Sequence, residues 1–271
     1  MFEFLTAPWS ESFFLRALVA VILTSITCAC LGAYVVLRRM AFVSTALTHS
    51  ILPGVVLASL LGLSPYLGAM AAALLTALGA AWLAARPETS EDSAIGIMLS
   101  VMFAAGIALM QVAHAWRDFS GLLFGSVVGV GPADLQVIAV TTSVVLVCLI
   151  ALHKELELAS CDEAYADLIG TRPGLLRTVL LVLIALAAVA CVRLVGALLT
   201  TALFVIPAAM GLYLGRNLKE VMLWSIGGAL LGGISGLYLS YYIQNLPTGA
   251  SIVLCTAIPY LAARIWSRRK R

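Results

Sequence analysis

The first long apolar run of the chain reads FFLRALVAVILTSITCACLGAYVVL and covers residues 13–37. It contains a single charged residue, Arg16, near its start. A membrane-spanning helix needs about 20 predominantly apolar residues to cross a hydrocarbon core of about 30 Å. Because this run is longer than that and nearly free of charge, it predicts a transmembrane helix.

Similar runs recur along the chain, and the composition agrees with them. Of the 271 residues, 62% are hydrophobic and 11% are charged, and the mean hydropathy is +1.08. A soluble domain usually carries about 25% charged residues, so the charges here are too few to cover a globule. The sequence therefore predicts an all-α integral membrane protein, a polytopic helical bundle that forms one transmembrane domain over residues 1–271.

About nine segments are long and apolar enough to be spans. They are 13–37, 41–62, 66–85, 94–113, 135–153, 177–192, 195–214, 221–243 and 249–267. Eight spans are also possible, because the sixth segment is short and its boundary with the seventh, near Arg193 and Gly196, is not sharply marked. The run Leu122–Gly131 is about half a span, which predicts a re-entrant or interfacial piece.

Basic residues predict the orientation, because short cytoplasmic loops are enriched in Lys and Arg. With the N-terminus outside, thirteen of the sixteen Lys and Arg residues fall in inner loops and the tail. The outer side then holds only Arg16, Arg117 and Arg193. This asymmetry fits nine spans and places the C-terminus in the cytoplasm. The basic tail Arg268–Arg271 is there expected to bind anionic lipid rather than nucleic acid.

One ionisable residue, His49, lies eight residues into the second predicted span. An ionisable group at membrane depth is a functional candidate. Thr45 lies one helical turn before it on the same face, and Thr48 is its neighbour. Imidazole is a good ligand for zinc, manganese or iron and a hydroxyl a weak one, so these residues predict an incomplete, low-affinity metal site. The alternative is a buried histidine that hydrogen-bonds to a neighbouring helix. Pro53 and Gly54 predict a bend just beyond it.

The longest inner loop, Lys154–Leu176, predicts a short amphipathic helix. The pattern Ser160-x-x-Glu163 is typical of a capping box, Asp162 and Glu163 favour a helix start, and Gly170 marks the end. One face of this helix carries Cys161, Tyr165, Leu168 and Ile169. Such a helix is expected to lie on the bilayer or to dock into a groove of a partner protein.

Gly228, Gly232 and Gly236 recur at four-residue spacing in the segment 221–243. Small residues at this spacing let two helix backbones approach closely in lipid. The repeat therefore predicts a close helix contact, either within the chain or between two chains.

The chain lacks the phosphate-binding loop of ATPases, which ends in Gly-Lys-Ser/Thr. Its three lysines follow His153, Leu218 and Arg269 instead. We therefore expect a transport subunit rather than an enzyme, with any ATP hydrolysis in a separate partner chain.

Three stretches of the sequence carry a family resemblance. They are RRMAFVSTALTHSILPG at 38–54, LFG at 123–125 with GPADL at 131–135, and VGALL at 195–199 running to VIPAA at 205–209. They resemble the zinc/manganese/iron ABC permeases, the ABC-3 type of metal ion permease, and the resemblance covers nearly the whole chain. One departure is Thr45, where the family signature commonly has an aspartate. A neutral hydroxyl attracts a dication less than a carboxylate does, so the choice among the three metals stays open.

The resemblance implies a permease of the bacterial cytoplasmic membrane that works as a dimer, with an identical chain or a sister permease. It implies that a divalent metal arrives from an extracytoplasmic metal-binding protein and that cytosolic ATP-binding-cassette subunits drive alternating access. It further implies that His49, with Thr45 and Thr48, lies on the metal path. The helix at 160–170 is then the coupling helix, and its expected ATPase contacts are Asp162, Glu163, Tyr165, Leu168, Ile169 and Gly170.

Two other classes of protein fit the sequence less well. An ion-coupled secondary transporter would usually carry carboxylates within its spans, whereas the acidic residues here lie in loops or at span edges. A membrane-embedded metalloprotease would need a motif such as His-Glu-x-x-His, which is absent, and the only serine beside a membrane-depth histidine is Ser50.

Overall fold

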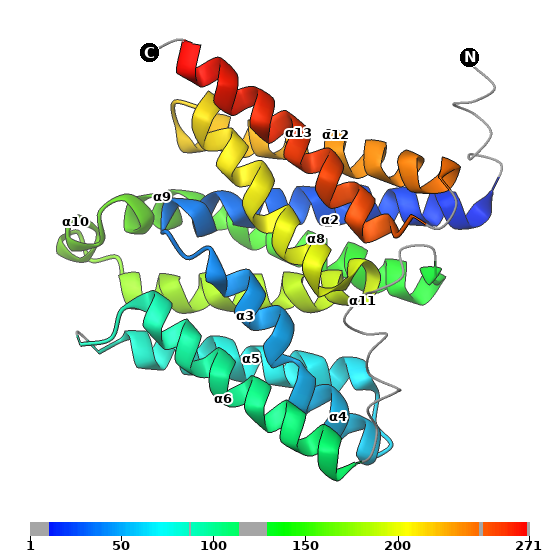
Figure 1. The fold of residues 1–271 in the computed structure, drawn as a ribbon. Helices are drawn as coiled ribbons and strands as arrows, with labels where there is room; N and C mark the ends of the chain where they lie inside the picture. Colours follow the sequence, from blue (N-terminus) through cyan, green and yellow to red (C-terminus); the bar gives the residue numbers. More distant parts are fainter. Residues whose placement is uncertain (1–10, 87, 114–128, 244–245, 270–271) are drawn as a thin grey trace. The chain divides into compact units, whose positions relative to one another are not determined.

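The computed structural model describes residues 11–86, 88–113, 129–243 and 246–269, and the regular structure of these residues is helical. The helices are α2 (Ser12–Leu37), α3 (Phe42–Ser50), α4 (Leu52–Leu60), α5 (Pro65–Ala84), α6 (Glu91–Val112), α8 (Pro132–Ala151), α9 (His153–Cys161), α10 (Glu163–Leu168), α11 (Pro173–Leu214), α12 (Leu218–Tyr242) and α13 (Thr248–Arg269) (Figure 1). The predicted all-α class is confirmed. Most of the half-span predicted at Leu122–Gly131 lies outside the described residues.

Within these residues, eight helical segments are long and apolar enough to cross a membrane. They are Ser12–Leu37, Phe42–Leu60, Pro65–Ala84, Glu91–Val112, Pro132–Ala151, Pro173–Val192, Leu218–Tyr242 and Thr248–Ser267. The remaining predicted span, 195–214, corresponds to a shorter apolar helix, Leu199–Leu214. The number of segments that cross the bilayer and the orientation of the termini therefore stay predictions.

The weakly marked boundary near Arg193 and Gly196 is a break inside α11. Gly196 has φ 78° and ψ 166°, a non-helical conformation that glycine adopts without steric cost. The sixth predicted span is not short, because its helix already begins at Pro173. Proline suits the first turn of a helix, where its missing N–H would have no partner in any case.

The chain forms two compact units. The first unit comprises Met1–Ala33, Phe124–Val144 and Ala190–Arg271, and the second unit comprises Tyr34–Leu123 and Val145–Val189. Helices α2, α8 and α11 contribute residues to both. His49 and the α9–α10 segment both belong to the second unit, so that unit holds the two regions singled out by the sequence.

In the second unit, α4 packs against α5 at the level of the backbone (Figure 1). A Cβ atom on Gly54 would meet the carbonyl oxygen of Gly68, and a Cβ on Gly68 would meet that of Gly54. Helix α4 also contacts α6, where Gly106 leaves room for Leu52. Glycines thus let α4 lie close to both neighbours.

The glycine repeat of the first unit serves packing within the chain. Gly232 and Gly236 lie against Thr256 and Ile252 of α13, and Gly228 lies against Met210 of α11. Of the two alternatives that the sequence left open for this repeat, the structure therefore supports the contact within one chain.

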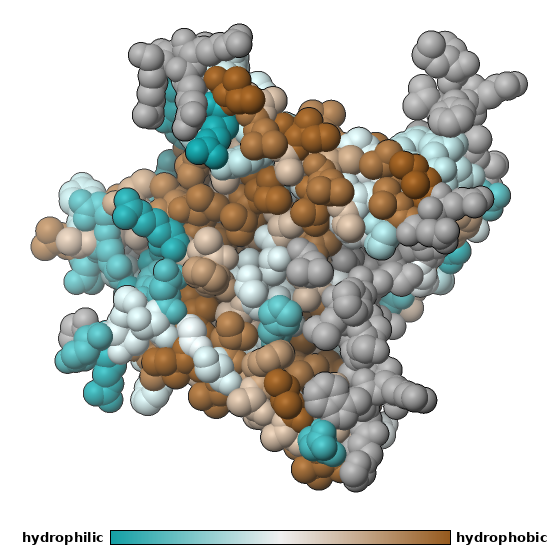
Figure 2. Space-filling model, in the orientation of Figure 1, coloured by the Kyte–Doolittle hydropathy of each residue, from teal (hydrophilic) through white to brown (hydrophobic). Residues whose placement is uncertain are grey.

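Large apolar side chains face outward along the described helices, and Figure 2 shows hydrophobic residues over much of the face in view. Examples are Leu67, Trp82, Val147, Ile150 and Leu231. Soluble monomers rarely expose large contiguous apolar surfaces. The exterior is therefore suited to lipid, in agreement with the predicted integral membrane protein.

Candidate functional site

The helix that carries His49 is interrupted directly after it. Helix α3 ends at Ser50, α4 begins at Leu52, and Pro53 lies in the first turn of α4. Proline has no N–H and cannot donate to the carbonyl four residues earlier, which here belongs to His49. Ile51, which joins the two helices, keeps helical dihedral angles (φ −69°, ψ −20°), so the chain is broken here in its hydrogen bonding and the bend itself stays a prediction.

The His49 ring has an aromatic neighbour and an unsatisfied nitrogen. It packs edge-on against the ring of Phe103 on α6, with ring centroids 5.9 Å apart. Its Nδ1 atom is buried and has no hydrogen-bond partner among the described residues. Buried polar atoms nearly always have a partner. This nitrogen is therefore not explained as a hydrogen bond to a neighbouring helix.

The two threonines near His49 differ in their surroundings. Thr45 is half-buried, as His49 is, and lies one turn before it on the same face of α3. Thr48 is buried, and its Oγ1 donates a hydrogen bond to the carbonyl oxygen of Thr45 at 2.9 Å. The structure thus brings Thr45 and His49 together, whereas the hydroxyl proton of Thr48 is already used by the backbone.

In the part of the chain that the structure describes, His49 does not belong to a cluster of strong metal ligands. Among the residues that the structure describes, no three His, Cys, Asp or Glu side chains come together as a metal site would require. One imidazole and one hydroxyl can hold a divalent ion only weakly. Such a pair can pass an ion on, but within one chain it does not form a storage or structural site.

The α9–α10 segment corrects one prediction from the sequence. Ser160 lies inside α9, and its buried Oγ has no partner among the described residues, so it does not cap a helix. The N-cap is Asp162, which has an extended backbone, and its Oδ1 accepts a hydrogen bond from the N–H of Tyr165 at 2.9 Å. The predicted capping box is therefore wrong, because α9 runs up to Cys161 and α10 starts only after the aspartate.

The end of α10 agrees with the prediction. Gly170 has φ +85°, its N–H donates to the carbonyl of Asp167, and the N–H of Thr171 donates to that of Ala166. These two bonds form a Schellman motif, in which a left-handed glycine lets the chain turn away from the helix. Both ends of this short helix are therefore stabilised by hydrogen bonds to capping residues.

Helix α10 is exposed on nearly all sides. Ala166 is its one buried residue. The exposed fractions of Tyr165, Leu168 and Ile169 are 53%, 84% and 52%. Exposed apolar side chains grouped in this way typically mark a site for a protein or a membrane.

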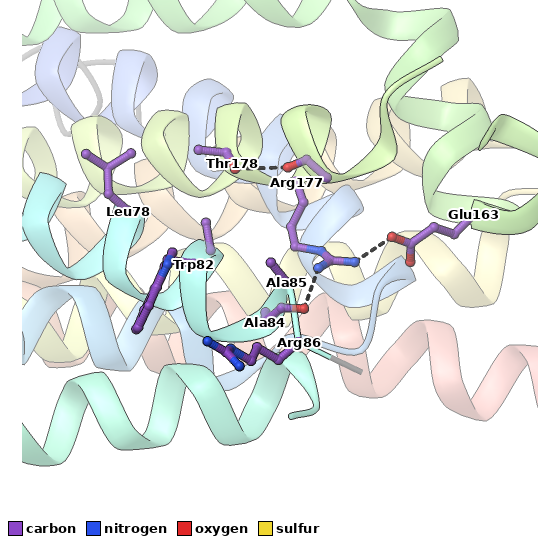
Figure 3. Close-up of a pocket in the computed structure, with 10 residues that line it drawn as sticks. Leu78, Trp82, Ala84, Ala85, Arg86, Glu163, Arg177 and Thr178 are labelled. Atoms are coloured by element: carbon purple, nitrogen blue, oxygen red, sulfur yellow. Dashed lines mark hydrogen bonds and ion pairs between the residues drawn. The ribbon is translucent and has the colours of Figure 1, made fainter. Parts of the chain in front are cut away.

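Two polar residues near this segment have partners that the sequence did not predict. His153, at the start of α9, has its Nδ1 2.8 Å from the hydroxyl of Tyr34. Arg177 forms an ion pair with Glu163 and donates to the carbonyl of Ala84 (Figure 3). These partners are far apart in the chain, so no local pattern could have indicated them. His114 and the side chain of Arg193 lie outside what the structure describes.

The bundle of long apolar helices defines a multi-pass membrane protein. Residues 10–267 match the model of the ABC 3 transport family. The chain belongs to the ABC 3 transport family, and the resemblance stated from the sequence is confirmed.

Individual relatives agree with this assignment. The chain is 31% identical to the "Probable iron transport system membrane protein" of Haemophilus influenzae, over 99% of this chain and 98% of that one. It is 30% identical to the manganese transport system membrane protein MntC of Listeria monocytogenes, over 98% of this chain and 95% of that one. The solved structure of PsaBC from Streptococcus pneumoniae in complex with Fab has a TM-score of 0.83 and 30% identity, covering 96% of this chain and 94% of that chain. The chain is therefore an ABC permease, a multi-pass protein of the cytoplasmic membrane.

Proposed function

We propose that the chain is the membrane-spanning permease of an ABC importer that carries a divalent transition metal into the cytoplasm. The observation that carries the proposal is the match to the ABC 3 transport family over residues 10–267. Relatives that are 31% and 30% identical to this chain are named as iron and manganese transport system membrane proteins. Manganese and iron are therefore the first metals to test, and zinc is the third.

The metal path is proposed to pass Thr45 and His49. The free Nδ1 of His49 and the shared half-buried face of α3 support this role. The weakness of the pair is an advantage for transport, because an ion that is bound tightly is not released. A second permease, identical or related, would supply the remaining walls of the path.

Helix α10 is proposed to be the coupling helix that enters a groove of a cytosolic ATPase. Its caps keep it helical without a partner, and its apolar side chains Tyr165, Leu168 and Ile169 are free to be buried on docking. An amphipathic helix in an apolar groove is a common mode of recognition. On the extracytoplasmic side of the membrane, a binding protein would deliver the metal to the permease.

The distribution of carboxylates favours an ATP-driven mechanism over an ion-coupled one. In the described spans, acidic residues lie in first turns: Glu91 and Asp92 in α6, Asp134 in α8 and Glu220 in α12. Carboxylates in the middle of a span, which coupling to protons or sodium usually requires, are not found there.

The proposal is tested by reconstituting the chain with its ATPase and binding protein in proteoliposomes. ATP-dependent uptake of manganese, iron and zinc is measured for the wild type, for His49→Ala and for Ser50→Ala. Ser50 is the matched control, because it is the buried neighbour of His49 and its hydroxyl donates to the carbonyl of Leu47 in its own helix.

We expect uptake of at least one metal that requires ATP, is reduced at least tenfold in His49→Ala and is nearly unchanged in Ser50→Ala. Uptake that persists without the ATPase would instead identify a secondary carrier. If ATP-dependent uptake is intact in His49→Ala, the permease function holds and the assignment of His49 to the metal path is wrong.

A further inference from the structure

Four charged side chains of the second unit meet where α10 joins the helices, and we call them the Arg177 junction. They are Arg38, Glu91, Glu163 and Arg177. The guanidinium of Arg177 lies 2.5 Å from Glu91 Oε1 through Nε and 2.5 Å from Glu163 Oε1 through Nη2. Arg38 Nη2 is 3.1 Å from the same Oε1 atom of Glu91. Two cations therefore balance two anions.

The junction joins elements that are distant in sequence. Arg177 lies in the first turns of α11, Glu91 in the first turn of α6 and Glu163 at the start of α10. Arg177 Nη1 also donates to the carbonyl of Ala84, the last residue of α5, at 2.8 Å. The guanidinium donates hydrogen bonds to Glu163 and Ala84, and its contact with Glu91 is an ion pair. Arg177 therefore ties α10 to α5, α6 and α11.

The ion pair between Glu163 and Arg177 lies at the wall of an open hollow. A hollow of ≈ 600 Å³ is lined by Trp82, Arg86, Glu163 and Arg177, among others (Figure 3). A second hollow of ≈ 470 Å³ is lined by Arg38, Glu91 and Glu163, among others. Glu163 borders both. Because α10 buries only Ala166, the helix can shift without displacing a packed core, and this ion pair is its polar tie to the other helices.

Helix α6, which is held at the Arg177 junction, also contacts His49. Helix α6 starts at Glu91, packs against α3 and α4, and carries Phe103, whose ring contacts the ring of His49. Within the second unit, a continuous set of contacts therefore runs from Glu163 through Arg177 and Glu91 along α6 to His49.

We propose that Arg177 is a positioning residue for energy coupling, which transmits the displacement of α10 to α6 and so to the His49 region. This inference rests on the proposed function, because α10 must be the element that the ATPase moves. Removing the ion pair between Glu163 and Arg177 should leave the permease and the ATPase assembled. ATP hydrolysis should then continue while less metal is moved per ATP.

Substitutions at two residues of the Arg177 junction distinguish a loss of coupling from a loss of stability. Arg177 is nearly buried, with 12% of its side chain exposed. Arg177→Gln removes one of the two cations paired with Glu91 and leaves Arg38 as the other, so this variant is expected to lose stability as well as the link. The side chain of Glu163 is 47% exposed. Exposed ion pairs contribute little to stability, so Glu163→Gln is the variant expected to fold normally.

The experiment measures metal uptake and ATP hydrolysis on the same proteoliposomes, for the wild type, Arg177→Gln, Glu163→Gln, Glu163→Asp and Arg172→Gln. Arg172 is the matched control, an exposed arginine just before α11. We expect the metal moved per ATP hydrolysed to fall at least tenfold in Arg177→Gln and Glu163→Gln, to recover at least partly in Glu163→Asp, and to stay within twofold of the wild type in Arg172→Gln.

The inference is overturned if Glu163→Gln assembles and keeps the wild-type ratio of uptake to hydrolysis. It is also overturned if hydrolysis and uptake fall in proportion, because Glu163 would then act in docking alone. These outcomes differ from a failure of the proposed function, in which the wild type itself shows no ATP-dependent uptake.

Discussion

At the scale of single residues, the chemistry proposed for this permease depends on Thr45 and His49. His49 offers a buried nitrogen that is not hydrogen-bonded to the described residues, and Thr45 shares its face of α3. Thr48 adds less than its position in the sequence suggests, because its hydroxyl is bonded to the carbonyl of Thr45. A neutral pair of this kind is expected to bind a dication weakly and to release it again.

Thr45→Asp should bind the metal more tightly. A carboxylate one turn from the imidazole adds a negative charge and a harder oxygen ligand, and both favour a divalent ion. We expect the affinity for manganese, measured by equilibrium binding to the purified chain, to rise at least tenfold. Thr45→Val is the control and should show no gain. Equal affinity in Thr45→Asp and in the wild type would mean that residue 45 does not face the ion.

At the scale of helices, α10 shows how a six-residue segment can be an independent element. A helix this short is unstable by itself, yet Asp162 caps its start and Gly170 ends it in a Schellman motif. Caps of this kind contribute about 1 kcal/mol each. The helix is therefore formed before any partner binds, and the apolar side chains stay exposed for docking.

Leu168→Ser should weaken association with the ATPase. Burying a leucine side chain contributes about 1.5–3 kcal/mol, and 1.4 kcal/mol corresponds to about a tenfold change in affinity. We therefore expect the dissociation constant of the subunits, measured in detergent, to rise at least tenfold. Leu63→Ser, at an equally apolar exposed position between α4 and α5, is the control and should leave it unchanged. An unaltered complex with Leu168→Ser would exclude α10 as the docking element.

Helix packing in the second unit gives a matched pair of glycine substitutions. A Cβ on Gly54 would collide with the backbone of α5, whereas a Cβ on Gly96 of α6 would meet nothing within 4 Å. We expect Gly54→Ala to destabilise the chain by about 1–3 kcal/mol, as overpacking does. Gly96→Ala should be neutral or stabilising by up to about 1 kcal/mol, because alanine is the better helix former. Thermal unfolding in detergent measures both, and equal midpoints would contradict the close contact of α4 and α5.

At the scale of the whole molecule, the orientation in the membrane can be read from a native thiol. Cys161 is exposed, Cys28, Cys30 and Cys191 are buried, and the two other cysteines lie in apolar helices. With the N-terminus outside, Cys161 faces the cytoplasm. A membrane-impermeant maleimide should therefore label inside-out vesicles and not intact cells, and Cys161→Ser should abolish the labelling. Labelling of intact cells would reverse the predicted orientation.

The sequence alone determined the class, the approximate spans and the family of this protein. Long apolar runs such as 13–37 can be identified without a structure, because a lipid-facing helix satisfies its own backbone and needs only length and low polarity. The break between α3 and α4 after His49 has a similarly local cause, since Pro53 acts on its own helix. The end of α10 at Gly170 is also a local effect of glycine.

Only the tertiary structure decided which side chains meet. Asp162 rather than Ser160 caps α10, because the end of α9 determines where a new helix can start. The glycines of α12 are used within the chain because α11 and α13 fill the space beside them. The Arg177 junction joins residues far apart in sequence, and such contacts depend on how helices pack rather than on any periodicity. Local rules determine each helix, whereas the link between the proposed docking helix and the histidine exists only in the folded chain.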